Sequence, residues 1–122
     1  MTNRLLIADA DAEMSDLYRR FFSHHGYEVE SAAGGLECLA KLRSRPNTYV
    51  ILDLEIPWGG GDGVLACLRE EFPERSHPIV VLTSRPFLQA GPEQVQPPVV
   101  RCFQKPCHLN ELLDCIRSTA EP

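Results

Sequence analysis

The chain has 122 residues, of which 43% are hydrophobic and 24% charged, and its formal net charge is −5 at pH 7. This length suits one domain with a single core, and the acidic balance argues against nucleic-acid binding, which needs a basic face. No apolar run approaches the roughly 20 residues that cross a bilayer, and the N-terminal segment lacks the apolar region of a secretory signal. The five cysteines form no CxxC pair, so we expect reduced thiols in a soluble, cytoplasmic protein.

Five short segments predict strands because they are rich in apolar and β-branched residues. The first and third are continuous apolar runs, as expected for strands that are covered on both faces. The third and fourth run directly into Asp53 and Thr83. The predicted strands cover residues 5–8, 27–32, 49–52, 78–82 and 99–103.

Helical spacing of apolar residues follows the first, second, third and fifth of these strands. The first helix is expected to stop at Gly26, the second before Pro46, and the third to begin at an N-cap on Asp62. Helix by helix, the apolar faces comprise Met14, Leu17, Tyr18, Phe21, Phe22 and His25; Leu36, Leu39, Ala40 and Leu42; Val64, Leu65, Leu68 and Phe72; and Leu109, Leu112, Leu113 and Ile116.

The alternation of strands and helices predicts an α/β fold with a doubly wound, five-stranded parallel sheet and helices on both faces. A fourth helix belongs in residues 85–98, but this segment contains four prolines and a glycine. Each proline in a helix interior costs about 3 kcal/mol. We therefore expect the fourth helix to be shortened or absent.

Polar side chains follow four of the predicted strands. Asp9 follows the first strand, Asp53 the third, Thr83 the fourth and Lys105 the fifth. In a doubly wound sheet the ligand site lies outside the carboxyl ends of the strands. These two carboxylates, one hydroxyl and one ammonium are therefore expected to share one edge of the sheet.

This set of groups suits phosphoryl transfer. Adjacent carboxylates repel each other unless a cation lies between them, and Mg²⁺ prefers oxygen ligands that a phosphate can complete. A carboxylate can itself attack phosphorus and form an aspartyl phosphate. Lys105 and Mg²⁺ would neutralise the phosphoryl oxygens, and Thr83 would donate a hydrogen bond to one of them.

The sequence resembles the receiver domain of two-component response regulators over nearly its whole length. The resemblance depends on the segments LLIADAD, VILDLEIP, GDGV, PIVVLTS and QKP, in this order and at these intervals. It implies a single receiver domain over residues 1–122 with a flavodoxin-like sheet in the strand order 2-1-3-4-5. Whether the chain is complete or part of a longer protein is left open.

The resemblance also implies a role for each residue of the site. Asp53 would be the phosphoacceptor, and the metal would be held by Asp9, Asp53 and the backbone carbonyl of Glu55. Thr83 and Ser84 would form the phosphate-binding switch with Lys105. The Lys105–Pro106 peptide would be cis, which proline makes accessible at about 0.5–1 kcal/mol.

The implied function is a Mg²⁺-dependent phosphorelay. A sensor histidine kinase or a phosphotransfer protein would supply the phosphoryl group to Asp53, and a conformational switch would signal to a downstream protein. The chain would then be a bacterial signalling domain whose own catalysis is limited to self-phosphorylation and self-dephosphorylation. The kinase, the downstream protein and the oligomeric state are not identified.

The acidic pair at the first strand departs from the family pattern. The second acid, which directly follows the first in the family and ligates the metal, is replaced by Ala10. Asp11 could compensate, since alternate residues of an extended chain share a side. Asp11 could instead be the N-cap of the first helix. Weakened Mg²⁺ affinity is expected in the second case.

Two further departures concern the switch and a loop. The family's switch aromatic, three residues before the lysine, is replaced by Cys102, and Phe103 is expected to face the opposite way and pack in the core. The glycine-rich loop 57–62 is longer than the family pattern, and its Trp58 could form a lid or a partner contact.

Two alternatives remain. The departures at Ala10 and Cys102 and the broken fourth helix favour a pseudo-receiver, a binding module that acts without phosphorylation. The LLIADAD segment also resembles the DxD strand motif of haloacid-dehalogenase-like phosphatases, in which Asp9 would be the nucleophile and Asp11 the acid/base. That family requires a late acidic pair, and its pattern leaves Asp53 without a role.

Overall fold

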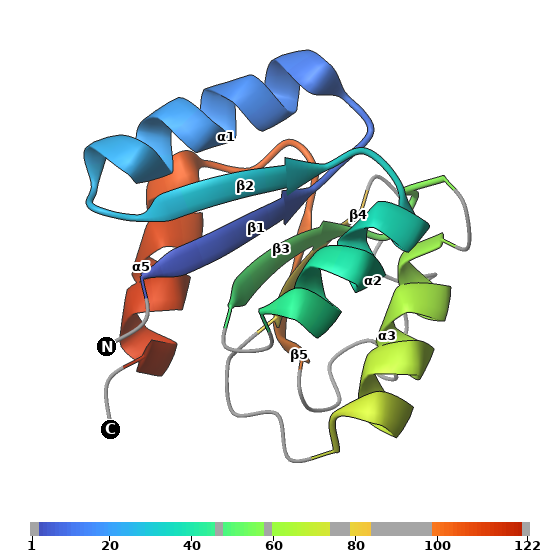
Figure 1. Ribbon diagram of the computed structural model, residues 1–122. Helices are drawn as coiled ribbons and strands as arrows, with labels where there is room; N and C mark the ends of the chain where they lie inside the picture. Colours follow the sequence, from blue (N-terminus) through green and yellow to red (C-terminus); the bar gives the residue numbers. More distant parts are fainter. Residues whose placement is uncertain (1–2, 46–47, 58–59, 74–78, 84–98, 121–122) are drawn as a thin grey trace.

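A computed structural model of the chain describes residues 3–45, 48–57, 60–73, 79–83 and 99–120. Strands and helices alternate, and the elements carry the labels of Figure 1. In chain order they are β1 (Arg4–Ala8), α1 (Ala12–His24), β2 (Glu28–Ala32), α2 (Gly35–Ser44), β3 (Tyr49–Asp53), α3 (Gly60–Glu71), β4 (Ile79–Thr83), β5 (Val99–Gln104) and α5 (Leu109–Ala120).

The strands form one parallel sheet, as the sequence pattern predicted, in the order β2-β1-β3-β4-β5 that the resemblance implied. Helices α1 and α5 cover one face, and α2 and α3 cover the other (Figure 1). Residues 85–98, where we expect the fourth helix to be shortened or absent, lie outside the described residues. Within the described ranges, no helix combines the length and apolar character that a bilayer crossing requires.

Two apolar cores lie on opposite faces of the sheet. Along β1, Leu5 and Ile7 face α1 and α5, whereas Leu6 and Ala8 face α2 and α3. This alternation follows from the strand geometry, which points successive side chains to opposite faces. Because both faces are buried, residues 5–8 of the strand are all apolar, and Arg4 stands at its less buried first position.

A register shift in β5 changes which of its residues face each core. Ile79 of β4 pairs with Val99 but Val80 pairs with Arg101, so Val100 is passed over and is 40% exposed. Such a bulge lets residues that differ in parity share a face. Val99 and Cys102 accordingly pack on the side of α2 and α3.

Two predicted helix ends agree with the structure and one differs: α2 ends at Ser44, before Pro46 as predicted. Helix α1 ends at His24, and Gly26 has a φ of +93°, the left-handed conformation that terminates a helix at low cost. Helix α3 begins at Gly60, so the predicted N-cap at Asp62 is wrong. The helix starts earlier because Gly61 packs directly on Leu54, where its N–H donates to the Leu54 carbonyl at 3.0 Å.

The apolar face predicted for α1 is narrower in the structure. Tyr18 and Phe22 are buried, as expected, but Leu17 is 48% exposed and Ser15 is buried. Leu17 lies about 100° around the helix from Tyr18, which places it at the edge of the stripe. The prediction that Leu17 faces the core is therefore wrong.

Candidate functional site

Three of the predicted site residues meet at the carboxyl edge of the sheet. Asp9 directly follows β1, Asp53 is the last residue of β3, and Lys105 directly follows β5. The ammonium Nζ of Lys105 lies 3.0 Å from Oδ2 of Asp9 and 3.4 Å from Oδ2 of Asp53. One cation therefore contacts both carboxylates.

Asp9 is held by hydrogen bonds at both its backbone and its side chain. Its N–H donates to the carbonyl of Ala32 at 3.0 Å, and its carbonyl accepts from the Ser15 hydroxyl at 3.2 Å. Its carboxylate accepts from the Asp11 N–H at Oδ1 (2.9 Å) and from Lys105 at Oδ2. With 3% of its side chain exposed, Asp9 has little freedom to move.

Asp53 also lies at the end of a strand, but its side chain is held by fewer close contacts than that of Asp9. Its Oδ1 accepts from the N–H of Glu55 at 3.0 Å, and its carbonyl accepts from the N–H of Ile56 at 3.2 Å. Burial raises the pKa of the Asp53 carboxyl; the Glu55 hydrogen bond and the charge of Lys105 offset this only in part. The ionised carboxylate is thus held in a site that disfavours its charge.

Lys105 is partly buried between these acids. Burial alone lowers the pKa of Lys105, but the hydrogen bond to Asp9 and the charges of Asp53 and Asp9 more than offset it, so the pKa lies above its ordinary value. The ammonium therefore stays charged at neutral pH. The Lys105–Pro106 peptide bond is cis, as the resemblance implied.

The structure assigns Asp11 to the helix cap. Its Oδ1 accepts from the N–H groups of Glu13 and Met14 at 3.0 and 3.2 Å, as the N-cap of α1 requires. Only its backbone N–H contacts Asp9 through a hydrogen bond. Ala10 between them has no side-chain oxygen. Of the described residues, Asp9 and Asp53 are the acids that contact Lys105 at this edge.

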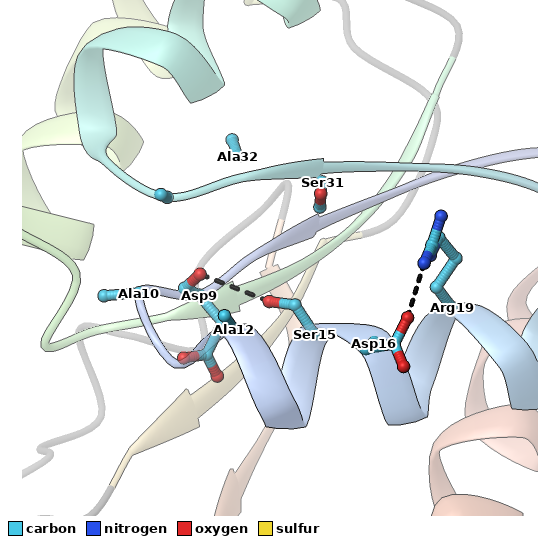
Figure 2. A pocket seen from close by; sticks show the side chains of 9 residues that line it. Asp9, Ala10, Ala12, Ser15, Asp16, Arg19, Ser31 and Ala32 are labelled. Carbon is cyan, nitrogen blue, oxygen red and sulfur yellow. Dashed lines mark hydrogen bonds and ion pairs between the residues drawn. The ribbon is translucent and has the colours of Figure 1, made fainter.

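A small pocket lined by both polar residues and alanines adjoins Asp9 between α1 and the end of β2. Its volume is about 320 Å³, and Figure 2 shows Ser15, Asp16 and Arg19 along its α1 side. The Ser15 hydroxyl donates to the Asp9 carbonyl, and Asp16 forms an ion pair with Arg19. The exposed residues Ala10 and Ala12 also line it.

Sequence reasoning missed two residues next to the site. Ser15 supports the backbone of Asp9, and the phenol of Tyr18 lies near the charges of Lys105, Asp9 and Asp53. Burial, together with the nearby Cys107, raises the pKa of Tyr18 to about 12. Ser15 shares a buried helical stripe with Tyr18 and Phe22. A polar residue on an otherwise apolar stripe could have indicated in the sequence that Ser15 has a hydrogen-bonding role.

The switch region is only partly described. Thr83 ends β4 and pairs with Gln104, the residue before Lys105, which places its backbone at the same edge. The predictions for the Thr83 side chain, Ser84 and Trp58 lie outside the described part of the chain. Phe103 is buried against α1 and α5 while Cys102 packs on the opposite face, as predicted.

The available oxygen ligands bear on metal binding. Two carboxylates and the expected carbonyl of Glu55 suit a hard cation such as Mg²⁺, which often takes one or two carboxylates and completes its shell with water and phosphate. Within the described residues, no three side chains of His, Cys, Asp or Glu form a group that could hold a metal ion.

Known proteins resemble this chain in sequence. Sporulation initiation phosphotransferase F of Bacillus subtilis is 26% identical over 117 residues, covering 96% of this chain and 93% of that protein. Response regulator MprA of Mycobacterium bovis is 32% identical over 125 residues, covering 97% of this chain but 50% of the relative, so the chain spans about half of that protein.

A solved structure shows the same fold. Response regulator protein TrrA from Thermotoga maritima, in complex with Mg(2+)-BeF, matches with a TM-score of 0.82 at 24% identity, covering 98% of this chain and 99% of that one. A family model described as the response regulator receiver domain matches residues 5–117. Together with the carboxylates and lysine at the edge of a 2-1-3-4-5 sheet, this match shows that the chain belongs to the receiver-domain family of phosphorelay signalling proteins.

Proposed function

We propose that Asp53 is the phosphoacceptor of this receiver domain. The proposal depends on one observation: the side chain of Asp9 is held more firmly than that of Asp53. Both carboxylate oxygens of Asp9 accept hydrogen bonds of 2.9–3.0 Å, whereas Oδ2 of Asp53 lies at the longer distance of 3.4 Å from Lys105. The Asp53 side chain is also the more exposed of the two, at 10% against 3%. Oδ2 of Asp53 is thus the better-placed nucleophile.

The reaction needs little covalent chemistry from the protein. Oδ2 of Asp53 attacks the phosphorus of a phosphohistidine or an acyl phosphate, the bond from phosphorus to the donor atom breaks, and an aspartyl phosphate forms. Negative charge on the three equatorial oxygens must be neutralised. Lys105 supplies one fixed positive charge at the required edge.

Receiver domains generally bind Mg²⁺, and here Asp9, Asp53 and the carbonyl of Glu55 would hold it. When bound, the cation would supply additional positive charge to the phosphoryl oxygens. Thr83 and Ser84 would contact the same oxygens through their hydroxyls. A sensor histidine kinase or a phosphotransfer protein would be the donor, and a further protein would receive the signal.

The test is chemical phosphorylation followed by mass spectrometry of the intact protein. Incubation with acetyl phosphate and Mg²⁺ should add one phosphoryl group, which hydroxylamine should remove because acyl phosphates react with it. Asp53→Asn should abolish the mass gain. Asp9→Asn retains the Asp53 carboxylate, so any phosphoryl group that this variant gains should still be on Asp53. A hydroxylamine-sensitive adduct that persists in Asp53→Asn would refute the assignment.

Ala10 and Cys102 support a second candidate, a binding module that acts without phosphate. Such a module would bind its partner equally well as native protein and as Asp53→Asn, and acetyl phosphate would change neither affinity. A partner that distinguishes the phosphorylated from the unphosphorylated protein would exclude it.

A further inference from the structure

The turn between β2 and α2 presents an apolar side chain to solvent at the edge of the sheet that carries the acid pair. Leu36, in the first turn of α2, is 69% exposed, more than any other large apolar residue that the structure describes. It lines a hollow of about 460 Å³ together with Ala33, Gly34 and Glu37. Ala33 also lines the pocket beside Asp9, so the two hollows meet at this residue. We call the two together the edge trough.

Small side chains lie along the edge trough next to this leucine. Ala10, Ala12 and Ala33 line it and are all exposed. Alanine at position 10 stands where the receiver pattern has an acid, so both charge and bulk are missing from this part of the surface. The cores of protein interfaces are likewise depleted of charged residues. The edge trough therefore has the composition of a contact surface.

The backbone that carries Leu36 is held in place by hydrogen bonds on both sides. The N–H of Ala33 donates to Oε1 of Glu37 at 2.8 Å. The N–H of Gly35 donates to the carbonyl of Pro57 at 2.9 Å, which joins the start of α2 to the loop after β3. A single exposed leucine is ordinary on a protein surface. A leucine on a backbone that is already ordered, however, costs less conformational entropy when a partner binds it.

The position of the edge trough indicates which partner covers it. A protein donor must bring its phosphohistidine to Oδ2 of Asp53, so its surface must lie over the turns at the carboxyl edge of the sheet. The edge trough begins at Asp9, which shares the ammonium of Lys105 with Asp53. The N–H of Asp9 in turn donates to the carbonyl of Ala32 at the end of β2. A donor that reaches Asp53 therefore has the edge trough directly beside its point of contact.

The charges around the edge trough determine the charge of a complementary partner. Asp11 and Glu13 at the start of α1 and Glu55 after β3 are exposed acids at this end of the molecule. Arg19 also lines the trough, but its charge is paired with that of Asp16. An apolar patch bordered by lysine and arginine side chains would complement such a surface.

We infer that the edge trough is a docking surface for the protein phosphodonor and that Leu36 is its specificity-determining contact, buried by an apolar patch of the donor that basic side chains border. This inference rests on the proposed role of Asp53. Leu36 takes no part in the transfer of the phosphoryl group. It determines which donor binds long enough for transfer to occur.

The experiment compares a protein donor with a small one. Purified histidine kinases and phosphotransfer proteins encoded in the same genome as this chain are labelled with radioactive ATP, and transfer to the native chain identifies the fastest donor. Leu36→Glu should lower kcat/KM for transfer from that donor by about tenfold or more, because it places a charge in an apolar contact. Labelling of Asp53 by acetyl phosphate, which needs no docking surface, should proceed at the native rate.

Val100→Glu is the matched control. Val100 is a 40% exposed apolar residue near the amino end of β5, at the opposite end of the sheet from Asp53. The same charge placed there should leave the rates from both donors close to native. Ala33→Glu, where the two hollows meet, should slow the protein donor as Leu36→Glu does. Added salt should slow the protein donor but not acetyl phosphate, because it screens the charges around the contact.

Three results would overturn the docking surface and leave Asp53 as the phosphoacceptor. The first is equal transfer from the protein donor to Leu36→Glu and Val100→Glu. The second is a loss of labelling by both donors in Leu36→Glu, which would show that the substitution disturbs the site itself. The third is a native chain that acetyl phosphate labels on Asp53 but no protein donor labels. If neither kind of donor labels Asp53, the proposed function fails and the inference fails with it.

Discussion

The ammonium of Lys105 donates a 3.0 Å hydrogen bond to Oδ2 of Asp9, although the two residues are 96 positions apart in the chain. The same ammonium lies 3.4 Å from Asp53. One side chain from the end of β5 thus joins the ends of β1 and β3. The contact stabilises the fold as well as the site, because its positive charge offsets part of the charge of two carboxylates that are largely out of water.

Replacement of this lysine should therefore destabilise the protein through the acids it leaves behind. Lys105→Met should lower the free energy of unfolding by about 1–3 kcal/mol at pH 7, measured by urea denaturation. In an Asp53→Asn background the same replacement should cost less, because one of the two charges is gone. Equal costs in both backgrounds would show that Lys105 does not interact energetically with Asp53.

Asp53→Asn by itself is the informative control for this cycle. Burial raises the pKa of Asp53 in the folded state above its value in the unfolded chain. Ionisation of this carboxyl therefore lowers the stability of the protein as the pH rises from the unfolded pKa through the folded pKa. The neutral amide should therefore unfold at a higher temperature than native at pH 7. The difference should diminish towards acid pH, where the native carboxyl is also neutral.

The two possible roles of Asp11 can be separated by the choice of substitution. Asp11→Ala removes the acceptor for the N–H groups of Glu13 and Met14 and should cost about 1 kcal/mol of stability. Asp11→Asn retains an oxygen in the same place and should be close to native. A loss of Mg²⁺ affinity in Asp11→Asn comparable to that in Asp9→Asn would instead assign Asp11 a ligand role.

Gly61 is expected to tolerate no side chain. A Cβ atom there would lie 2.6 Å from Cα of Leu54 and 3.1 Å from the carbonyl oxygen of Asp53. Gly61→Ala should therefore cost about 1–3 kcal/mol, as overpacking of a well-packed region does, measured by thermal denaturation. Gly63→Ala is the control in the same helix, because a Cβ there meets no atom within 4 Å and alanine should add up to about 1 kcal/mol. A Gly61→Ala protein as stable as Gly63→Ala would contradict the close packing.

Tyr18 predicts how the protein responds to alkali. Its pKa is raised from 10.0 to about 12, chiefly by burial. Unfolded chains lose this proton first, so the folded state binds more protons than the unfolded state between these values, and stability falls as the pH rises through them. Tyr18→Phe should reduce that loss when unfolding temperatures are compared from pH 9 upwards by circular dichroism. Parallel declines in the native and variant proteins would show that the Tyr18 phenol ionises as freely folded as unfolded.

Much of the architecture follows from local pattern. The continuous apolar runs at β1 and β3 and the helical spacing in α1 and α3 require a parallel sheet that is covered on both faces. Once that sheet is accepted, its carboxyl ends must bring Asp9, Asp53 and Lys105 to one edge. The resemblance to receiver domains supplied the strand order and the cis bond at Pro106, which composition and periodicity alone do not determine.

Other features depended on contacts between distant segments. Asp11 is compatible with a cap or a ligand in sequence, and only the path of the chain into α1 selected the cap. The periodicity of apolar residues likewise did not predict the bulge at Val100 or the exposure of Leu17, since each depends on how one element packs against another.

The sequence by itself determined which chemical groups are present at the strand ends, which are two acids and a lysine. The resemblance to receiver domains marked Ala10 as the position where a further acid would stand. Only the tertiary structure decided how these charges are shared. Residue spacing along the chain sets the face on which a side chain lies, but the pairing of Lys105 with both acids depends on distances that arise when β1, β3 and β5 occupy one sheet. Electrostatic energies depend on those distances and on burial, and both are set only when the chain has folded.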